Sequence, residues 1–262
     1  MAEPQIRYYQ DELNDEFSTA KITPKHIDGS YRYDGGCMRK IGRFFWYDVV
    51  AKPLASLFLK VKFHHKIVNG ECLKEAGTQG IFLYGNHTHA LADALIPTMV
   101  AKPKGVYVIV HPNNVSMPVL GRITPCLGAL PLPDDMEGMK NFTRSIRSHI
   151  EKGECIHIYP EAHIWPYYTG IRAFTDNSFS YPVKQKAPVY CFTNTYQKWK
   201  NSNTPQIVTY VDGPFRADES RNAKEQRKLL RDQVYETMKK RSENNNVELI
   251  RYVKADSEGD KR

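Results

Sequence analysis

The sequence lacks the features that mark a secreted, zinc-bound or membrane-spanning protein. Its 262 residues include an odd number of cysteines with no Cys-x-x-Cys pair: Cys37, Cys72, Cys126, Cys155 and Cys191. We therefore expect neither a disulfide framework nor a zinc knuckle. No apolar run reaches the 18 residues typical of a spanning helix. The first residues, MAEPQIRYY, contain no apolar signal region. These absences predict a reducing, cytosol-facing location.

Several catalytic and binding motifs are missing as well. Gly-x-Ser-x-Gly is absent, so no serine nucleophile and no acyl-enzyme is expected. His-Glu-x-x-His is absent too, and we expect no metal and no cofactor. A metal-dependent hydrolase stays an alternative whose ligands would come from scattered side chains: His87, His89, Asp93, His111, His157 and His163. RRM, KH and zinc-finger patterns are absent, which argues against a nucleic-acid partner.

Charge and size indicate the class of protein and of partner. Lys and Arg exceed Asp and Glu by 37 to 29, a net charge of +8. This excess favours anionic partners, and because it is spread along the chain it suits the phosphates of CoA and of lipid headgroups. Hydrophobic residues make up 41% and charged residues 25% of a chain long enough for one α/β domain with added pieces, or two small domains.

The pattern along the chain divides it into four parts. Residues 1–40 are polar and acidic near the start, and are predicted to form an arm with little regular structure. Residues 41–63 form an amphipathic segment, residues 64–250 an α/β domain, and residues 251–262 a flexible tail.

Strand-like and helical stretches alternate in the third part. Helical periodicity is clearest at residues 138–152 and 222–241. The strand-like runs are Lys66–Asn69, Ile81–Tyr84, Val106–Val110, Ala129–Leu132, Cys155–Tyr159, Val189–Thr193 and Ile207–Val211. Alternation of this kind predicts an α/β fold whose central sheet is mostly parallel or mixed and is flanked by helices.

The segment 41–63, IGRFFWYDVVAKPLASLFLKVKF, mixes aromatic and basic residues. Amphipathic rings and long cationic side chains suit the headgroup region of a bilayer, so the segment is a candidate for peripheral or monotopic attachment to the cytosolic membrane face. A helix kinked at Pro53 and packed on the core explains the same composition, and the sequence leaves both interpretations open.

The most informative stretch is GIFLYGNHTHALADALIP, residues 80–97. A strand is predicted to end at Tyr84 and a helix to begin near Thr88. In open α/β sheets, sites gather at the carboxyl ends of strands. There a hydrogen bond from His87 to Asp93 would fix the imidazole tautomer and raise its basicity, as a general base requires. A merely structural histidine near a helix start is the alternative.

This arrangement resembles the PlsC-type glycerolipid acyltransferases, the lysophosphatidic acid acyltransferase family. Its signature is Asn-His, four residues and Asp. Four segments match the family's blocks in order: Asn86-His87 with Asp93, Leu120–Leu132 (LGRITPCLGALPL), Tyr159-Pro160-Glu161, and Ala187-Pro188-Val189. The resemblance covers about residues 64–215 and implies an acyltransferase-like fold. It also implies transfer from acyl-CoA or acyl carrier protein to a lysophospholipid or glycerol phosphate-type acceptor, with His87 as base and Asp93 as its partner.

The sequence departs from the family pattern in three places. Five residues separate His87 from Asp93, whereas His89 lies four positions before Asp93 and is the reserve base. The second block has no arginine after Gly128. The family's Glu-Gly-Thr-Arg reads Glu161-Ala162-His163-Ile164. Because the family's arginines are associated with the acceptor phosphate, a non-catalytic membrane- or lipid-binding relative is the alternative function.

The remaining site predictions concern substrate binding. Arg172, in TGIRAF, is our candidate for the phosphate-binding cation, ahead of Arg122 and Lys184. Glu161 is expected to orient the acceptor or that cation. Asn86 is the fourth substrate-binding candidate with His163, which either contacts substrate or caps its loop. Trp165, Tyr167 and Tyr168 line a groove or pack, and the sequence does not decide between these roles.

Overall fold

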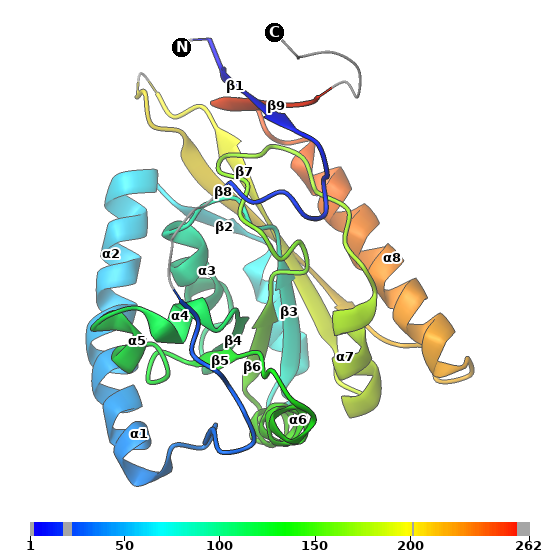
Figure 1. The fold of residues 1–262 in the computed structure, drawn as a ribbon. Coiled ribbons are helices and arrows are strands. Elements are labelled where there is room, and N and C mark those ends of the chain that lie inside the picture. The colour runs from blue at the N-terminus through cyan, green and yellow to red at the C-terminus, as the bar shows by residue number, and fades with distance from the viewer. Residues whose placement is uncertain (1–2, 18–22, 201, 256–262) are drawn as a thin grey trace, which may run out of the picture.

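A seven-stranded sheet forms the centre of the molecule. A computed structural model of the chain describes residues 3–17, 23–200 and 202–255. The strands are β2 (Lys66–Val68), β3 (Ile81–Gly85), β4 (Val106–Val110), β5 (Ala129–Pro131), β6 (Cys155–Ile158), β7 (Val189–Gln197) and β8 (Gln206–Phe215). Their order is β2-β8-β7-β3-β6-β4-β5, and neighbours are parallel except for β7 and β8 (Figure 1). This confirms the predicted mostly parallel sheet, and each predicted strand is present.

Helices cover both faces of the sheet. One face carries α2 (Lys52–Phe63) and α3 (Ala92–Val100), and the other carries α6 (Met136–Glu151), α7 (Ser180–Gln185) and α8 (Ala223–Ser242) (Figure 1). The shorter elements are α1 (Gly36–Arg43), a π-helical stretch η1 (Phe44–Ala51), the 3-10 turns η2 (Gly70–Ala76) and η3 (Asn177–Phe179), α4 (Asn113–Ser116) and α5 (Leu120–Ile123). The two helices predicted from periodicity are α6 and α8.

Side-chain alternation on β3 explains why helices are needed on both faces. Phe82 and Tyr84 pack into the core beneath α6 and α8, whereas Ile81 and Leu83 pack into the core beneath α2 and α3. Every residue of β3 is buried. A strand covered on both faces has a continuous apolar sequence rather than an alternating one, which is why the apolar run Ile81–Tyr84 predicts a strand.

The two ends of the chain form a second, two-stranded sheet, which corrects two predictions. Strand β1 (Gln5–Tyr9) pairs in parallel with β9 (Ile250–Lys254) (Figure 1). The arm 1–40 therefore has regular structure, and it also contains the start of α1. The tail predicted at 251–262 is wrong for residues 251–254, and residues 256–262 lie outside the described residues. Each strand obtains its hydrogen bonds from the opposite end of the chain, so neither segment carries a local signal.

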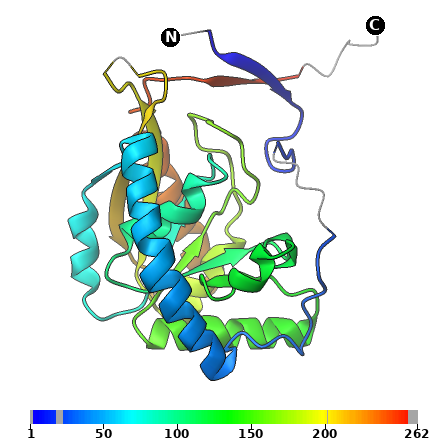
Figure 2. The same ribbon diagram turned by 90° about the vertical axis from the view of Figure 1, so that its left-hand side faces the viewer.

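The segment 36–63 is one continuous helix made of α1, η1 and α2, which crosses the front of the molecule in Figure 2. Pro53 stands at the start of α2, where its missing N–H is tolerated. Tyr47, Ala55, Leu59 and Phe63 are buried against the domain. The packed-helix interpretation of residues 41–63 is therefore correct for one side of the helix.

Candidate active site

The turn after β3 is irregular rather than helical. The predicted helix does not begin near Thr88 but at Ala92, so Asp93 lies in the first turn of α3. Residues 86–89 have no regular secondary structure. This loop brings His87 and Asp93 together although five residues separate them. The fifth residue is accommodated because the loop curves around the Asp93 carboxylate.

The carboxylate of Asp93 is held by four donors. Its Oδ2 accepts the backbone N–H groups of Thr88 and His89, both at 2.8 Å, and contacts Nδ1 of His87 at 2.9 Å. Its Oδ1 lies 3.4 Å from Nδ2 of Asn194. Asp93 is 1% exposed, so these four contacts take the place of water around its carboxylate. A carboxylate can only accept, so Nδ1 of His87 carries the proton and the lone pair of the neutral ring is on Nε2.

Tyr159, the residue that follows β6, supports this pair. Its ring stacks on the His87 imidazole with centroids 4.1 Å apart and an 11° angle between planes. Its hydroxyl donates to the backbone carbonyl of Asp93 at 2.6 Å. Burial raises the pKa of Tyr159 well above its ordinary value, so this hydroxyl keeps its proton. Both members of the pair are thereby fixed by one side chain.

The reserve base His89 is engaged differently. Its Nδ1 accepts backbone N–H groups from Leu91 and Ala92, at 3.3 and 3.1 Å. Its Nε2 lies 3.4 Å from the hydroxyl of Tyr167. Burial lowers the pKa of His89, which keeps the ring neutral. Because the lone pair on Nδ1 is used within the loop, the geometry favours His87 over His89 as a proton acceptor.

Asn86 is structural rather than exposed to substrate. It is 1% exposed, and its side chain pairs with the backbone of Asn194 on β7: Nδ2 donates to the carbonyl at 3.0 Å, and Oδ1 accepts the N–H at 2.7 Å. These two bonds continue the β3–β7 ladder past the end of β3. Asn86 thus fixes the backbone from which His87 projects, which differs from the substrate-binding role predicted.

Glu161 and Arg172 also lie inside the protein. The Glu161 carboxylate accepts the backbone N–H of His87 at 2.9 Å and that of Arg172 at 3.0 Å. It lies 3.6 Å from Nη2 of Arg172, and both side chains are at most 1% exposed. Burial raises the pKa of Glu161 and lowers that of Arg172, while each charge opposes the shift of the other. Glu161 therefore positions the His87 backbone.

The predicted phosphate-binding role of Arg172 does not fit its position. Its guanidinium donates to the backbone carbonyls of Glu161, His163 and Glu12 and lies over the Trp165 ring at 4.9 Å. Segments on all sides enclose it, including the N-terminal arm. The loop does bring Arg172 back beside Glu161, as predicted, but the guanidinium is buried there.

The loop 161–172 packs under the N-terminal arm. Trp165 is fully buried and its indole N–H donates to the Asp15 carbonyl at 2.8 Å, so it packs rather than lining a groove. Tyr168 contacts the same indole. His163 keeps about a third of its side chain exposed, and its Nδ1 lies 3.8 Å from Glu16. His163 thus keeps an accessible polar side chain in this loop.

Two contributors to the site were missed by the sequence analysis. Asn194 anchors both Asn86 and Asp93, and Tyr159 fixes the pair described above. The signal for Asn194 is the polar run Thr193-Asn194-Thr195 within an otherwise apolar strand, because buried polar groups need partners. For Tyr159, its place just before Pro160-Glu161 was noted, but its contact with His87 depends on the tertiary structure.

His157, which is fully buried, lies behind Tyr159. Nδ1 of His157 contacts the Leu83 carbonyl at 2.8 Å, and since a carbonyl only accepts, Nδ1 carries the proton. Its Nε2 has no hydrogen-bond partner among the described residues. Burial lowers the pKa of His157 to about 3, so the ring stays neutral in the folded protein.

Because His157 is buried in its neutral form, we predict that the free energy of unfolding falls in acid. The pKa of His157 in the folded protein, about 3, lies below the ordinary value of 6.5. Its contribution to the free energy of unfolding is therefore complete above pH 6.5 and declines as the pH falls toward 3. Between about pH 6.5 and pH 4.5 the loss is about 2–3 kcal/mol. Urea unfolding near pH 7.5 and pH 4.5 measures it, and His157→Gln should lose less over the same interval. Equal losses in the two proteins would refute the assignment, since His65, whose pKa burial lowers to about 4, is present in both.

The described residues offer little support for a metal centre. In residues 3–17, 23–200 and 202–255, no three His, Cys, Asp or Glu side chains are grouped so as to hold an ion. The histidines considered for a metal-dependent hydrolase are separated, or are occupied as His157 is by the Leu83 carbonyl.

Comparison with known proteins identifies the fold. No family model matches the chain, and no curated protein matches it. Among solved structures, it is similar to the 1-acyl-sn-glycerophosphate (LPA) acyltransferase PlsC from Thermotoga maritima, with a TM-score of 0.54 and 13% sequence identity over 81% of this chain and 86% of that one. The chain therefore has the PlsC-like α/β fold that the order of its four sequence blocks predicted.

Proposed function

We propose that the protein is an acyltransferase that moves a fatty acyl group from acyl-CoA or acyl carrier protein to a hydroxyl of a lysophospholipid or glycerol phosphate-type acceptor. The observation that carries this proposal is the 2.9 Å contact between Nδ1 of His87 and Asp93. The pair lies where β3 ends in the fold of a known acyltransferase. The pair is formed although the spacing departs from the family signature, which favours an enzyme over a degenerate relative.

The chemistry follows from the protonation of the pair. Nε2 of His87 takes the proton of the acceptor hydroxyl while its oxygen bonds to the thioester carbon. Asp93 stabilises the imidazolium that forms. The C–S bond then breaks, and the leaving thiolate takes the proton from Nε2. General-base assistance of this kind contributes about 10²–10⁴-fold, and holding two reactants together contributes more.

The test is an acyl-transfer assay with the purified full chain. One labelled acyl-CoA, and the same acyl group on acyl carrier protein, are offered with a panel of lysophospholipids and glycerol 3-phosphate. Formation of an ester product from at least one pair supports the proposal. Vesicle binding without any product would instead favour the non-catalytic lipid-binding relative, whose supporting observation is the burial of Arg172.

We also propose that the protein works at an anionic, cytosolic membrane face. The outer side of the helix 36–63 carries a stripe of exposed apolar side chains: Met38, Ile41, Phe45, Val49, Leu54, Leu57 and Val61. This membrane-facing stripe extends along a helix about 40 Å long. The same helix has six Lys and Arg residues against one carboxylate, and that carboxylate, Asp48, is paired with Lys52 at 2.6 Å. Within the described part of the chain, none of the helices combines the length and apolarity required to cross a bilayer.

Leu54→Asp is expected to weaken binding to anionic vesicles by about tenfold or more, because burial of one leucine side chain in an apolar phase is lost and a negative charge is added. Flotation with vesicles of anionic and of zwitterionic lipid measures the effect. Leu229→Asp is the matched control, since Leu229 is an exposed leucine of α8 on the other face of the sheet. Equal losses in the two variants would show that the stripe is not the binding surface.

A further inference from the structure

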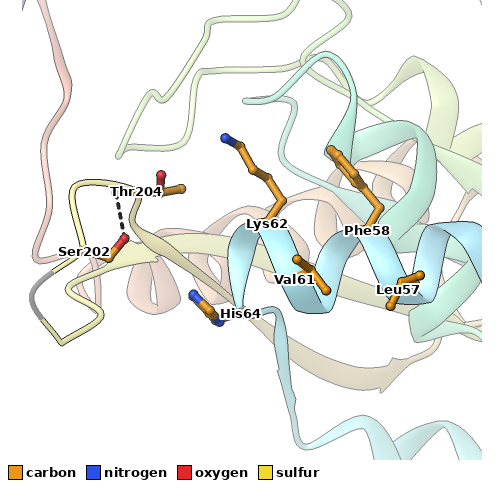
Figure 3. A pocket seen from close by; sticks show the side chains of 7 residues that line it. All are labelled: Leu57, Phe58, Val61, Lys62, His64, Ser202 and Thr204. Atoms are coloured by element: carbon orange, nitrogen blue, oxygen red, sulfur yellow. Dashed lines mark hydrogen bonds between the residues drawn. The ribbon is translucent and has the colours of Figure 1, made fainter.

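A groove lies between the C-terminal half of α2 and the connection between β7 and β8. It has a volume of about 600 Å³. Figure 3 shows Leu57, Phe58 and Val61 along the helix, with Ser202 and Thr204 of the connection beyond its C-terminal end. The groove is open to solvent, so a ligand can enter it from the surface of the protein.

The lining divides into an apolar and a polar part. Leu57, Phe58 and Val61 form the apolar part over about one turn of α2. Lys62 and His64 supply nitrogen atoms at the helix end, and Ser202 and Thr204 supply hydroxyl groups. The described residues that line the groove include no carboxylate. This combination matches a ligand with an acyl chain at one end and a phosphate at the other, because cationic and hydroxyl donors suit phosphate oxygens.

Aromatic contacts connect the lining of the groove with the loop of the candidate active site. Phe63 lies between Lys62 and His64 in the sequence, and its buried ring contacts the ring of His89 at 4.9 Å. Phe58 contacts Phe63 at 5.7 Å. His89 is held in turn by Asp93. A ligand in the groove therefore lies beside the loop that carries the catalytic pair.

The groove also adjoins the membrane-facing stripe. Leu57 and Val61 belong to both surfaces. A single-chain lipid in the leaflet that the stripe contacts thus lies next to the groove. Continuity of this kind distinguishes the groove from an isolated surface depression.

We propose that this groove binds the acceptor as a lysophospholipid, with its acyl chain along Leu57, Phe58 and Val61 and its phosphate at Lys62. The inference rests on the proposed function and deepens it. The acceptor phosphate needs a cation, and Arg172, the cation predicted from the sequence, is buried in its own loop. Lys62 is exposed and lines the groove together with the connection residues.

Binding of monomeric lysophosphatidate, below its aggregation threshold and without vesicles, tests the proposal directly. Lys62→Gln is expected to weaken binding about tenfold, since a charge-assisted contact is lost. Lys60→Gln is the matched control, because Lys60 is an exposed lysine of the same helix that does not line the groove. The apolar part is tested in the same way with Leu57→Ser against Leu54→Ser, two leucines with similar exposure, of which Leu57 lines the groove.

Comparison with two smaller ligands shows which part of the lipid the groove recognises. A monoacylglycerol with the same chain lacks the phosphate and should bind weakly, with no difference between wild type and Lys62→Gln. Glycerol 3-phosphate should compete poorly, and full competition would overturn the lipid assignment in favour of a site for phosphate alone. Equal effects of Lys60→Gln and Lys62→Gln would also overturn the proposal, because they would show nonspecific charge attraction.

Binding and turnover separate this proposal from the proposed function. If lysophosphatidate binds as described but is not acylated, the groove stands and the acyltransferase proposal fails. If acylation occurs and Lys62→Gln leaves KM for the acceptor unchanged, the groove proposal fails and the acyltransferase proposal stands. Where both are correct, Lys62→Gln raises KM about tenfold with little change in kcat.

Discussion

His87→Ala is expected to lower kcat for acyl transfer by about 10²–10⁴-fold, because the general base that takes the acceptor proton is removed. The fold should be retained, since the His87 ring is partly exposed and the contacts that hold this loop to β7 and to Glu161 come from Asn86 and from the backbone of His87. Steady-state rates with saturating donor and acceptor measure the loss, and a urea transition near that of wild type shows that the protein is folded.

Two further variants make this prediction specific. Asp93→Asn keeps the size of the side chain but replaces the acceptor that holds the proton on Nδ1 of His87, so a comparable loss of kcat is expected. His89→Gln removes the reserve base, whose Nδ1 is already bonded to the backbone of Ala92, and should reduce kcat far less than His87→Ala. A larger loss in His89→Gln than in His87→Ala would reverse the assignment, and wild-type rates in both His87→Ala and Asp93→Asn would end the proposed mechanism.

The sequence predicted the position of the pair but not how it is formed. The apolar run Ile81–Gly85 and the Asn-His that follows it place His87 at the carboxyl end of a buried strand. The sequence predicted that the helix carrying Asp93 begins near Thr88, whereas α3 begins at Ala92. The actual loop is irregular and is stabilised by backbone N–H groups that bond to the Asp93 carboxylate. Such loop conformations depend on tertiary contacts with β6 and β7, for which side-chain periodicity gives no signal.

Three of the predicted substrate-binding residues lie inside the protein, which the sequence did not indicate for a related reason. Asn86, Glu161 and Arg172 stand at positions typical of ligand contact, yet each is used to join segments that are distant in the sequence. The burial of Arg172 depends on the N-terminal arm, whose Glu12 carbonyl lies 160 residues earlier and 3.4 Å from Nη1. Polar residues near a site contribute either to binding or to the scaffold, and burial decides between these roles.

Arg172→Met is expected to lower the free energy of unfolding by about 3–5 kcal/mol, since it leaves the Glu161 carboxylate buried without its cation. Backbone carbonyls of Glu161 and His163 lose a donor in the same variant. The control is Arg147→Met on the exposed face of α6, where the pair with Glu151 is more than half exposed on both sides and a change of at most about 1 kcal/mol is expected. Urea unfolding followed by circular dichroism measures both.

The double variant Arg172→Met with Glu161→Gln separates the ion pair from the packing around it. If the uncompensated charge causes most of the loss, neutralising Glu161 restores part of the stability that Arg172→Met removes, and the two effects are not additive. Limited proteolysis provides a second readout, because the guanidinium also donates to the Glu12 carbonyl and its loss should expose residues 10–17 to cleavage. If Arg172→Met is as stable as Arg147→Met and the arm is still protected from cleavage, Trp165 and the surrounding aromatic rings hold the loop without the cation. Arg172 would then be available for another role.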